Sequence, residues 1–306
     1  MSLTVENAGV LSLLQDLGRY GFQNIGVTPG GPMDSHAFHW ANKLLDNPVN
    51  TTVVEITMGG FKARFNKATT FSICGANAVI TLNNETITAW CSYQAKVGDC
   101  IEIGYATSGV RTYLSVAGGF NVVQILNSSS SVMRNKLGGL SQNGQELKNG
   151  DSIPYSEVVL PFSRKVPNCF VADYKDTIEV GVLPTYQHYE FSQEARQLFF
   201  NSEYTVTSES NRMGYKLTGS AIKIDCSSFI SEGIALGAIQ IPQNGLPIVL
   251  MKDRQTIGGY PKIGCVCNKD LNLLAQAPAG TKIRFVLKEL YEAEAQLQME
   301  NNYFNQ

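Results

Sequence analysis

The sequence predicts an all-β protein with a few short helices. Short runs that alternate apolar and polar residues, or that are rich in β-branched residues, recur along the 306-residue chain between turn residues. A glycine turn that leads into such a run recurs at 97–103, 149–153 and 279–285, which favours barrels. Strands and helices do not alternate, so a parallel doubly wound sheet is disfavoured.

The predicted strands share a length of about four to six residues and turn residues at both ends. They are Val53–Met58, Thr69–Cys74, Ala78–Leu82, Thr86–Trp90, Cys100–Tyr105, Thr112–Val116, Ile178–Leu183, Tyr204–Thr207, Ala221–Asp225 and Lys282–Leu287.

Helices are few, and the clearest spans Asp34–Asp46. Asp34 is placed to cap its N-terminus, and Pro48 prevents its extension. Shorter helices are expected at Gln193–Phe200 and near Asp270–Gln276, and a polar, loosely docked helix from Lys288 to about Met299.

The chain length suits two packed domains. The polar, proline-interrupted stretch 161–176 predicts a boundary between them. We therefore expect an N-terminal β-barrel subdomain at 1–165 and a C-terminal β-barrel subdomain with a helical tail at 166–306.

Composition limits the environment and the partners. Hydrophobic residues make up 43% and charged residues 16%, which allows a sizeable core and argues against disorder. With 24 Lys+Arg against 26 Asp+Glu there is no basic excess, so nucleic acid is not an expected partner. No apolar stretch approaches the roughly 20 residues of a membrane span, and no signal peptide is expected.

The seven cysteines are scattered and odd in number, which indicates reduced thiols in a cytoplasmic protein. We expect Cys265 and Cys267 to face opposite sides of a strand, so that they do not form a metal clip. No metal site is expected elsewhere.

The stretch Ser231–Gly264 is the strongest candidate for a functional site. The runs Ala238–Pro242 and Pro247–Met251 flank an Asn-Gly turn, which predicts a hairpin. Charged and amide residues follow beside a glycine pair, and they are Lys252, Asp253, Arg254, Gln255, Gly258, Gly259, Tyr260 and Lys262. Glycines allow close backbone approach to a ligand, and Arg and Lys supply positive charge. The alternative is a salt-bridged barrel rim.

Common catalytic motifs are absent from the sequence. It contains no G-x-x-x-x-G-K-[ST] phosphate loop, no G-x-S-x-G elbow and no H-E-x-x-H pair. Met251-Lys252 is similar to the centre of a biotin-accepting hairpin, but Asp253 follows where an apolar residue is usual. We therefore expect no biotin attached to this chain.

Ordered motifs along almost the whole chain resemble the allophanate hydrolase subunit 2 family, also called the KipA-like or biotin-dependent carboxyltransferase-domain family. They are Gln15–Gly21, Gly26-Val27, Gly31–Asp34, Ala41-Asn42, Glu55–Thr57, Tyr113–Gly119, Leu137–Leu140, Asn211–Tyr215 and the stretch 231–264. Two departures affect expected ligand contacts: Ser129 stands where members often have arginine, and Asn211 replaces a frequent aspartate.

The resemblance implies two cyclophilin-like β-barrel subdomains. Stand-alone bacterial members are similar to the C subunit of 5-oxoprolinase, which works with a homologous B subunit and a separate A subunit in the ATP-dependent opening of 5-oxo-L-proline to L-glutamate. It thus implies ATP with Mg, bound here or by a partner subunit. Two other functions are open: a carboxyltransferase half of a urea-type biotin-dependent carboxylase, and a regulatory protein that antagonises a kinase inhibitor.

This chemistry assigns roles to the candidate residues. Arg254 and Lys262 are expected to stabilise phosphate and developing negative charge, with Arg212 and Arg19 as anion clamps. Gln255 and Tyr260 are expected to orient the amide. Asp253, Glu232 and Asp34 are expected either to position water or a metal or to pair with a neighbouring arginine. Gly258 and Gly259 are expected to permit close approach of the substrate.

Overall fold

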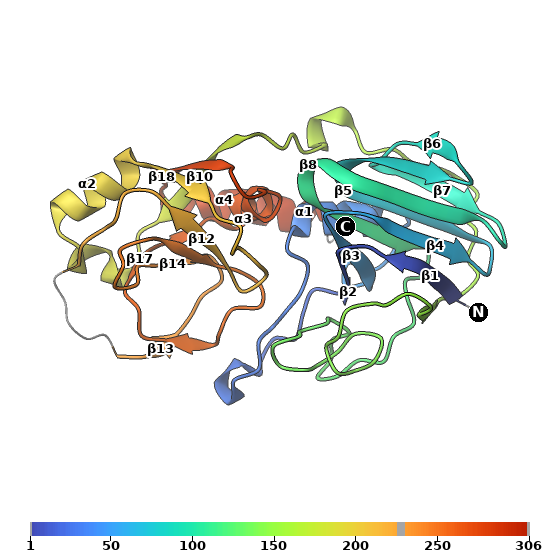
Figure 1. The fold of residues 1–306 in the computed structure, drawn as a ribbon, viewed down its shortest axis with the longest axis horizontal. Helices are drawn as coiled ribbons and strands as arrows, with labels where there is room; N and C mark the ends of the chain where they lie inside the picture. Colours follow the sequence, from blue (N-terminus) through green and yellow to red (C-terminus); the bar gives the residue numbers. More distant parts are fainter. Residues whose placement is uncertain (1, 225–229, 305–306) are drawn as a thin grey trace. The chain divides into compact units, whose positions relative to one another are not determined.

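The computed structural model describes residues 2–224 and 230–304. Contacts divide the chain into two compact units. The first contains residues 1–20 and 30–174, and the second contains residues 21–29 and 175–306. Each unit is built around its own sheet of mainly antiparallel strands (Figure 1). The predicted all-β class with few helices is therefore confirmed.

The first unit holds a curled nine-stranded sheet among its described residues. Its central path runs β2-β3-β8-β4-β1-β9, and β5 joins β6, β7 and β8. The elements are β1 (Ser2–Ala8), β2 (Leu11–Gln15), α1 (Ser35–Lys43), β3 (Val53–Thr57), β4 (Phe61–Phe65), β5 (Thr69–Leu82), β6 (Glu85–Ile87), β7 (Cys91–Ala95), β8 (Cys100–Val116), β9 (Ser152–Pro154) and the 3₁₀ turn η2 (Asn168–Phe170).

The second unit is a closed barrel with the strand order β10-β17-β14-β15-β12-β11-β18. Parallel pairing of β18 with β10 closes it. The elements are η1 (Gln23–Ile25), β10 (Thr177–Leu183), η3 (Tyr186–Glu190), α2 (Gln193–Asn201), β11 (Glu203–Val206), β12 (Gly214–Thr218), β13 (Glu232–Gly233), β14 (Ala238–Gln240), β15 (Ile248–Leu250), β16 (Ile257–Gly258), β17 (Lys262–Val266), α3 (Asn268–Ala275), β18 (Lys282–Leu287) and α4 (Leu290–Phe304).

Alternating burial shows why these runs form strands. In β18 the buried residues Ile283 and Phe285 alternate with exposed Lys282 and Arg284. Phe285 stacks on Phe199 of α2 with ring centroids 4.6 Å apart, so α2 packs against the barrel wall. The three glycine turns recognised in the sequence lead into β8, β9 and β18, as predicted.

Several predicted strand limits were wrong. The two runs on either side of Gly75 form one long strand, β5, because Gly75 takes a φ of 114° and the ladder bulges there instead of ending. The strand predicted at 86–90 ends at Ile87, and Trp90, with a φ of 62°, lies in a bend. Residues 221–224 form no strand, because Ile222 bonds to the turn residue Gly245 instead of to a ladder; position 225 lies outside the described residues.

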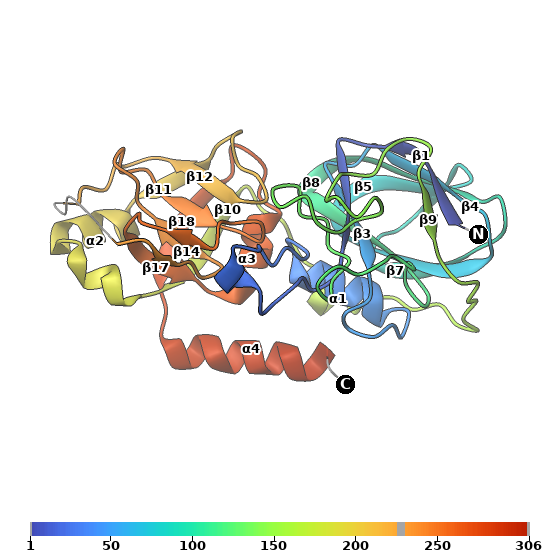
Figure 2. The ribbon, with the colours of Figure 1, turned by 90° about the horizontal axis from the view of Figure 1, so that it is seen from below.

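The helices agree closely with the predictions. Asp34 caps α1, its Oδ1 accepting from the Ala37 N–H at 3.0 Å. Ser192 caps α2 in the same way. α4 lies outside the barrel (Figure 2) and buries no residue, in keeping with a loosely docked tail. In residues 2–224 and 230–304, no helix is both long and apolar enough to cross a membrane.

We expect Asp34→Ala to lower the free energy of unfolding by about 1–2 kcal/mol, because the first turn of α1 loses its side-chain acceptor. Asp34→Asn keeps an oxygen in the same place and is expected to retain most of the stability. Urea denaturation followed by circular dichroism measures both. A fall as large for Asp34→Asn as for Asp34→Ala would contradict the capping role.

Candidate active site

The stretch singled out in the sequence forms a hairpin and a short ribbon on the second unit. The predicted hairpin is confirmed, since β14 pairs with β15 in register Ile239–Val249 and Gln240–Ile248. The chain beyond β15 then returns through β16, which pairs with β13 through Glu232–Gly258 and Gly233–Ile257. This β13–β16 ribbon, of which Figure 1 labels β13, brings residues near 232 and near 258 together.

Lys262 and Glu232 form an ion pair where this ribbon meets β17. The Lys262 Nζ lies 2.6 Å from the Glu232 Oε1 and donates to the Tyr260 carbonyl at 3.2 Å. Gln187 donates from Nε2 to the same carboxylate oxygen at 3.0 Å, and the Tyr186 hydroxyl donates to the other oxygen. Lys262 is 5% exposed, so a buried ammonium is held against a partly exposed carboxylate.

Arg254 lies beside a cavity of about 250 Å³. Its guanidinium donates to the carbonyls of Ile234 at 3.1 Å and Met251 at 3.3 Å. Arg254 and Lys262 are thus both bound to the short segment 232–234, one on each side of Gly233. The cavity is lined by Gln23, Pro29, Gly233, Ile234, Arg254, Gln255 and Thr256.

The remaining residues near the glycine pair have distinct positions. Gln255 lines the cavity and donates from Nε2 to the Gln240 Oε1 at 3.5 Å. Gly258 has no positive φ. A glycine is needed there for close packing, because an added β-carbon would lie 2.7 Å from the Ile234 Cδ1. Gly259 follows β16, and the Tyr260 side chain is about half exposed while its carbonyl binds Lys262.

Arg212 and Asp253 bind each other. The Arg212 Nε and Nη2 donate to the two carboxylate oxygens at 2.8 and 2.9 Å, and each residue is 4% exposed. The backbone reinforces the pair, since the Asp253 N–H donates to the Arg212 carbonyl at 2.9 Å. Asp253 was expected either to position water or a metal or to pair with an arginine, and the structure shows the pairing with Arg212. A direct contact of either residue with substrate stays a prediction.

Arg19 and Asp34 belong to the first unit. Arg19 is 1% exposed, and its guanidinium donates to the carbonyls of Ile125, Ser128 and Ser130. The serine run that contains Ser129 is buried around Asp16, whose carboxylate accepts from the Ser128, Ser129 and Ser130 hydroxyls. These contacts hold the loop 125–131.

The surroundings of Asp34 keep two phenols protonated. The Tyr113 hydroxyl accepts from the Asp34 N–H at 2.8 Å and donates to the Glu55 Oε2 at 2.8 Å. The Tyr174 hydroxyl donates to the Asp34 Oδ2 at 3.5 Å. Burial raises the pKa of Tyr113 and of Tyr174 well above the usual tyrosine value, and the neighbouring carboxylates add to this shift.

Three polar residues of the site were missed in the sequence. Tyr186 and Gln187 lie in η3, which sequence reasoning left unassigned, and both contact Glu232. Gln240 lies in the middle of the hairpin strand, 1% exposed. In the sequence, Gln240 is marked by being a single amide residue between Ile239 and Ile241 in an otherwise apolar run.

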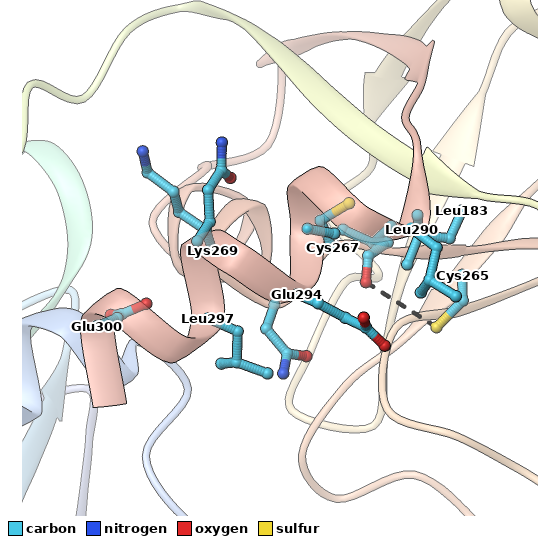
Figure 3. Close-up of a pocket in the computed structure, with 12 residues that line it drawn as sticks. Leu183, Cys265, Cys267, Lys269, Leu290, Glu294, Leu297 and Glu300 are labelled. Atoms are coloured by element: carbon cyan, nitrogen blue, oxygen red, sulfur yellow. Dashed lines mark hydrogen bonds between the residues drawn. The ribbon is translucent and has the colours of Figure 1, made fainter. Parts of the chain in front are cut away.

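A separate apolar groove of about 200 Å³ lies between β17, α3 and α4. Figure 3 shows Cys265 and Cys267 on its wall, together with Leu290 and Leu297 of α4. The expectation that the two cysteines face opposite sides of a strand was wrong. The strand β17 ends at Val266, Cys267 is the N-cap residue of α3, and both cysteines line the same groove. Burial raises the pKa of Cys265 to about 11 and raises that of Cys267, so both thiols stay protonated. Among the described residues, no group of three or more acidic, His or Cys side chains suits a metal ion.

Asp270 of α3 gives the second unit a pH dependence. Burial raises the pKa of its carboxyl, although the Gly181 N–H at 2.8 Å and two nearby lysines act in the opposite direction. As the pH rises above about 3.9, the usual aspartate pKa, the unfolded chain loses this proton first. The free energy of unfolding contributed by Asp270 therefore falls until the pH passes the raised native pKa.

We expect Asp270→Asn to remove that fall and to stabilise the chain at pH 7, since the amide oxygen still accepts from Gly181. Urea denaturation of the variant and the wild type between pH 4 and pH 7 tests this. A variant less stable than the wild type at pH 7 would show that the carboxylate is favourable in the native state.

Comparisons with known proteins agree with this architecture. Residues 25–287 match the family described as carboxyltransferase domain, subdomain A and B. The chain is 34% identical over 308 residues to the C subunit of 5-oxoprolinase from Escherichia coli, covering 99% of this chain and 97% of that protein. It is 34% identical over 297 residues to the C subunit of 5-oxoprolinase from Haemophilus influenzae, covering 95% and 92%.

Among solved structures, the Kluyveromyces lactis urea carboxylase superposes with a TM-score of 0.92 at 28% identity. The match covers 99% of this chain and 29% of that one. Sequence and structure thus agree over nearly the full length, and the chain belongs to the carboxyltransferase domain, subdomain A and B, family.

Proposed function

We propose that this chain is a subunit of an ATP-dependent 5-oxoprolinase complex that opens 5-oxo-L-proline to L-glutamate. The observation that carries the proposal is the 34% identity to the C subunit of a 5-oxoprolinase, with 99% of this chain and 97% of that protein aligned. The alignment thus spans nearly all of both sequences, whereas the urea carboxylase match spans 29% of a much longer chain.

The chemistry requires coupling to ATP because a lactam carbonyl is a poor electrophile. Transfer of the γ-phosphoryl group to the lactam oxygen gives ADP and an activated carbon. Water then attacks that carbon and the ring C–N bond breaks, which leaves an acyl phosphate. A second water hydrolyses this acyl phosphate, so that glutamate, ADP and phosphate are the products. Positive groups held in place stabilise the charge on the oxygen.

The second unit offers suitable groups for this task. Lys262 supplies a buried ammonium beside Glu232, and Arg254 supplies a guanidinium at the wall of the cavity. We propose that the cavity takes the substrate, and that ATP with Mg is bound at least partly by a partner subunit. The proposed partners are the A subunit of 5-oxoprolinase and a B subunit homologous to this chain.

A carboxyltransferase half of a urea-type carboxylase is the second candidate. It is favoured by the TM-score of 0.92 with urea carboxylase. That reaction needs biotin carried by another domain or chain. Lys252, which follows Met251 as in a biotin-accepting hairpin, is 9% exposed, and this burial supports the proposal that it carries no biotin.

Co-expression with candidate A and B subunits tests the proposal. The purified mixture is supplied with 5-oxoproline and ATP, and glutamate and ADP are measured. Equal amounts of both products are expected only when all subunits and both substrates are present. Copurification with a biotinylated protein and transfer of carboxylate to urea would support the second candidate instead. Binding only to a kinase inhibitor would indicate the regulatory function.

A further inference from the structure

A buried amide nitrogen with no partner lies next to the Lys262–Glu232 pair. Gln240 is 1% exposed, and within the described part of the chain its Nε2 has no hydrogen-bond partner. Native proteins rarely keep a buried N–H donor unpaired, because its lost hydration is not replaced. The amide therefore needs a partner that is not part of the folded chain.

The fold directs this donor toward the ribbon. A β-carbon added to Gly258 would lie 3.1 Å from the Gln240 Nε2 and 3.6 Å from the Gln255 Nε2. Two amide nitrogens from separate segments thus face the same glycine of β16. Because Gly258 has no side chain, no side chain at this position covers the two nitrogens.

Register places Gln240 beside the ammonium of the site. Gln240 on β14 pairs directly with Lys262 on β17, and paired residues share one face of a sheet. The ladder bulges between Ile239 and Gln240, which is a device that redirects side chains near functional sites. An oxygen bound by Gln240 would therefore lie on the same face as Lys262.

Gln255 links this donor to the cavity. It lines the cavity of about 250 Å³ and holds the Gln240 Oε1 through a single long hydrogen bond of 3.5 Å. A bond of this length is weak. A ligand that offers a better acceptor can replace it, and a rotation of Gln255 then opens the way from the cavity to the Gln240 N–H groups.

The charges around Gln240 favour a neutral acceptor. The Lys262 ammonium is balanced by Glu232 at 2.6 Å, and the Gln240 and Gln255 amides carry no charge. We infer that Gln240 is a substrate-positioning residue that binds the carbonyl oxygen of a small amide, with Gln255 as its movable neighbour. Only the choice of a lactam as this amide rests on the proposed function.

Gln240→Met tests the inference because methionine has a similar length and no N–H group. In the free chain we expect its melting temperature to equal or exceed that of the wild type, since an unpaired buried donor is removed. Gln187→Met is the matched control. Both amide atoms of Gln187 are bonded, to Glu232 and to the Lys262 N–H, so the control is expected to melt at a lower temperature.

Ligand-observed NMR titrations of the full chain supply the binding measurement. 5-Oxoproline, 2-pyrrolidinone and urea carry an amide carbonyl, whereas L-proline carries a carboxylate without one. We expect Gln240→Met to lower the affinity for the three amides about three- to tenfold, as for the loss of one hydrogen bond, and to leave any binding of L-proline unchanged.

Three results would overturn the inference: no binding of any amide to the wild-type chain, equal amide affinity in Gln240→Met, or a loss of melting temperature as large as in Gln187→Met. The proposed function is tested separately. If the complex with Gln240→Met forms glutamate with an unchanged KM, the inference fails and the function stands. If the wild-type complex forms no glutamate but Gln240→Met loses amide binding, the function fails and the inference stands.

Discussion

Replacing Arg212 with leucine is expected to lower the free energy of unfolding by about 3–5 kcal/mol, a larger loss of stability than that expected for Asp34→Ala. The substitution leaves the Asp253 carboxylate, 4% exposed, without the two charge-assisted hydrogen bonds that it accepts at 2.8 and 2.9 Å. A buried charge without a partner is more costly than the net gain from the intact pair. Urea denaturation followed by circular dichroism measures the loss.

Two further variants identify the cause. Arg212→Leu combined with Asp253→Leu removes both charges, so we expect a smaller loss than the sum of the single changes. Lys216→Ala is the matched surface control. Lys216 lies in β12 and pairs with Glu209, which lies before that strand; the two side chains are 50% and 69% exposed. Loss of this exposed ion pair is expected to change the free energy of unfolding little. Additive losses in the double variant would show that the two residues act separately.

The probe matters because the chain has two units. Both tryptophans, Trp40 and Trp90, lie in the first unit, whereas Arg212 lies in the second. Circular dichroism follows the strands of both units, while tryptophan fluorescence follows the first. The Arg212→Leu loss is therefore expected in the circular dichroism transition, and a single unfolding midpoint should not be assumed.

Local signals were sufficient to predict much of the fold. Asp34 and Ser192 stand before helical runs, and Asn244-Gly245 stands between apolar strands, so nearby residues alone set these features. Closure of the barrel could not be predicted from such local signals. It depends on the parallel pairing of β10 with β18, about 100 residues apart in sequence, and alternation within a strand does not identify its partner.

The site was predictable in part for the same reason. The sequence placed Lys262, Glu232 and Arg254 in one stretch, and the β13–β16 ribbon brings that stretch together. The pairing of Arg212 with Asp253 spans 41 residues, and its partners were predicted individually without their mutual contact being assigned. Gln240 was missed because its significance lies in an unpaired donor, which depends on what surrounds it in space.

Replacing Lys262 with methionine is expected to lower kcat of the reconstituted complex by about 100- to 1000-fold, the largest effect on activity. The reason is that the ammonium is the buried positive group on the same face as Gln240, and a fixed group that stabilises developing charge typically contributes a factor of this size. Glutamate and ADP formation at saturating substrate measures the change. Lys62→Met, at the exposed Lys62–Glu102 pair of the first unit, is the control and should retain full activity.

Glu232→Gln separates electrostatic catalysis from support of the fold. It keeps an oxygen near Lys262 and leaves the ammonium in place, so a catalytic ammonium predicts that this variant keeps much more activity than Lys262→Met. A purely structural ion pair predicts that removing either charge lowers the melting temperature and the activity in parallel. Because Glu232 is 32% exposed and can be hydrated after Lys262 is lost, we expect Lys262→Met to remain folded and to copurify with its partners while turnover is lost. Equal activities of the two variants would remove Lys262 from the mechanism.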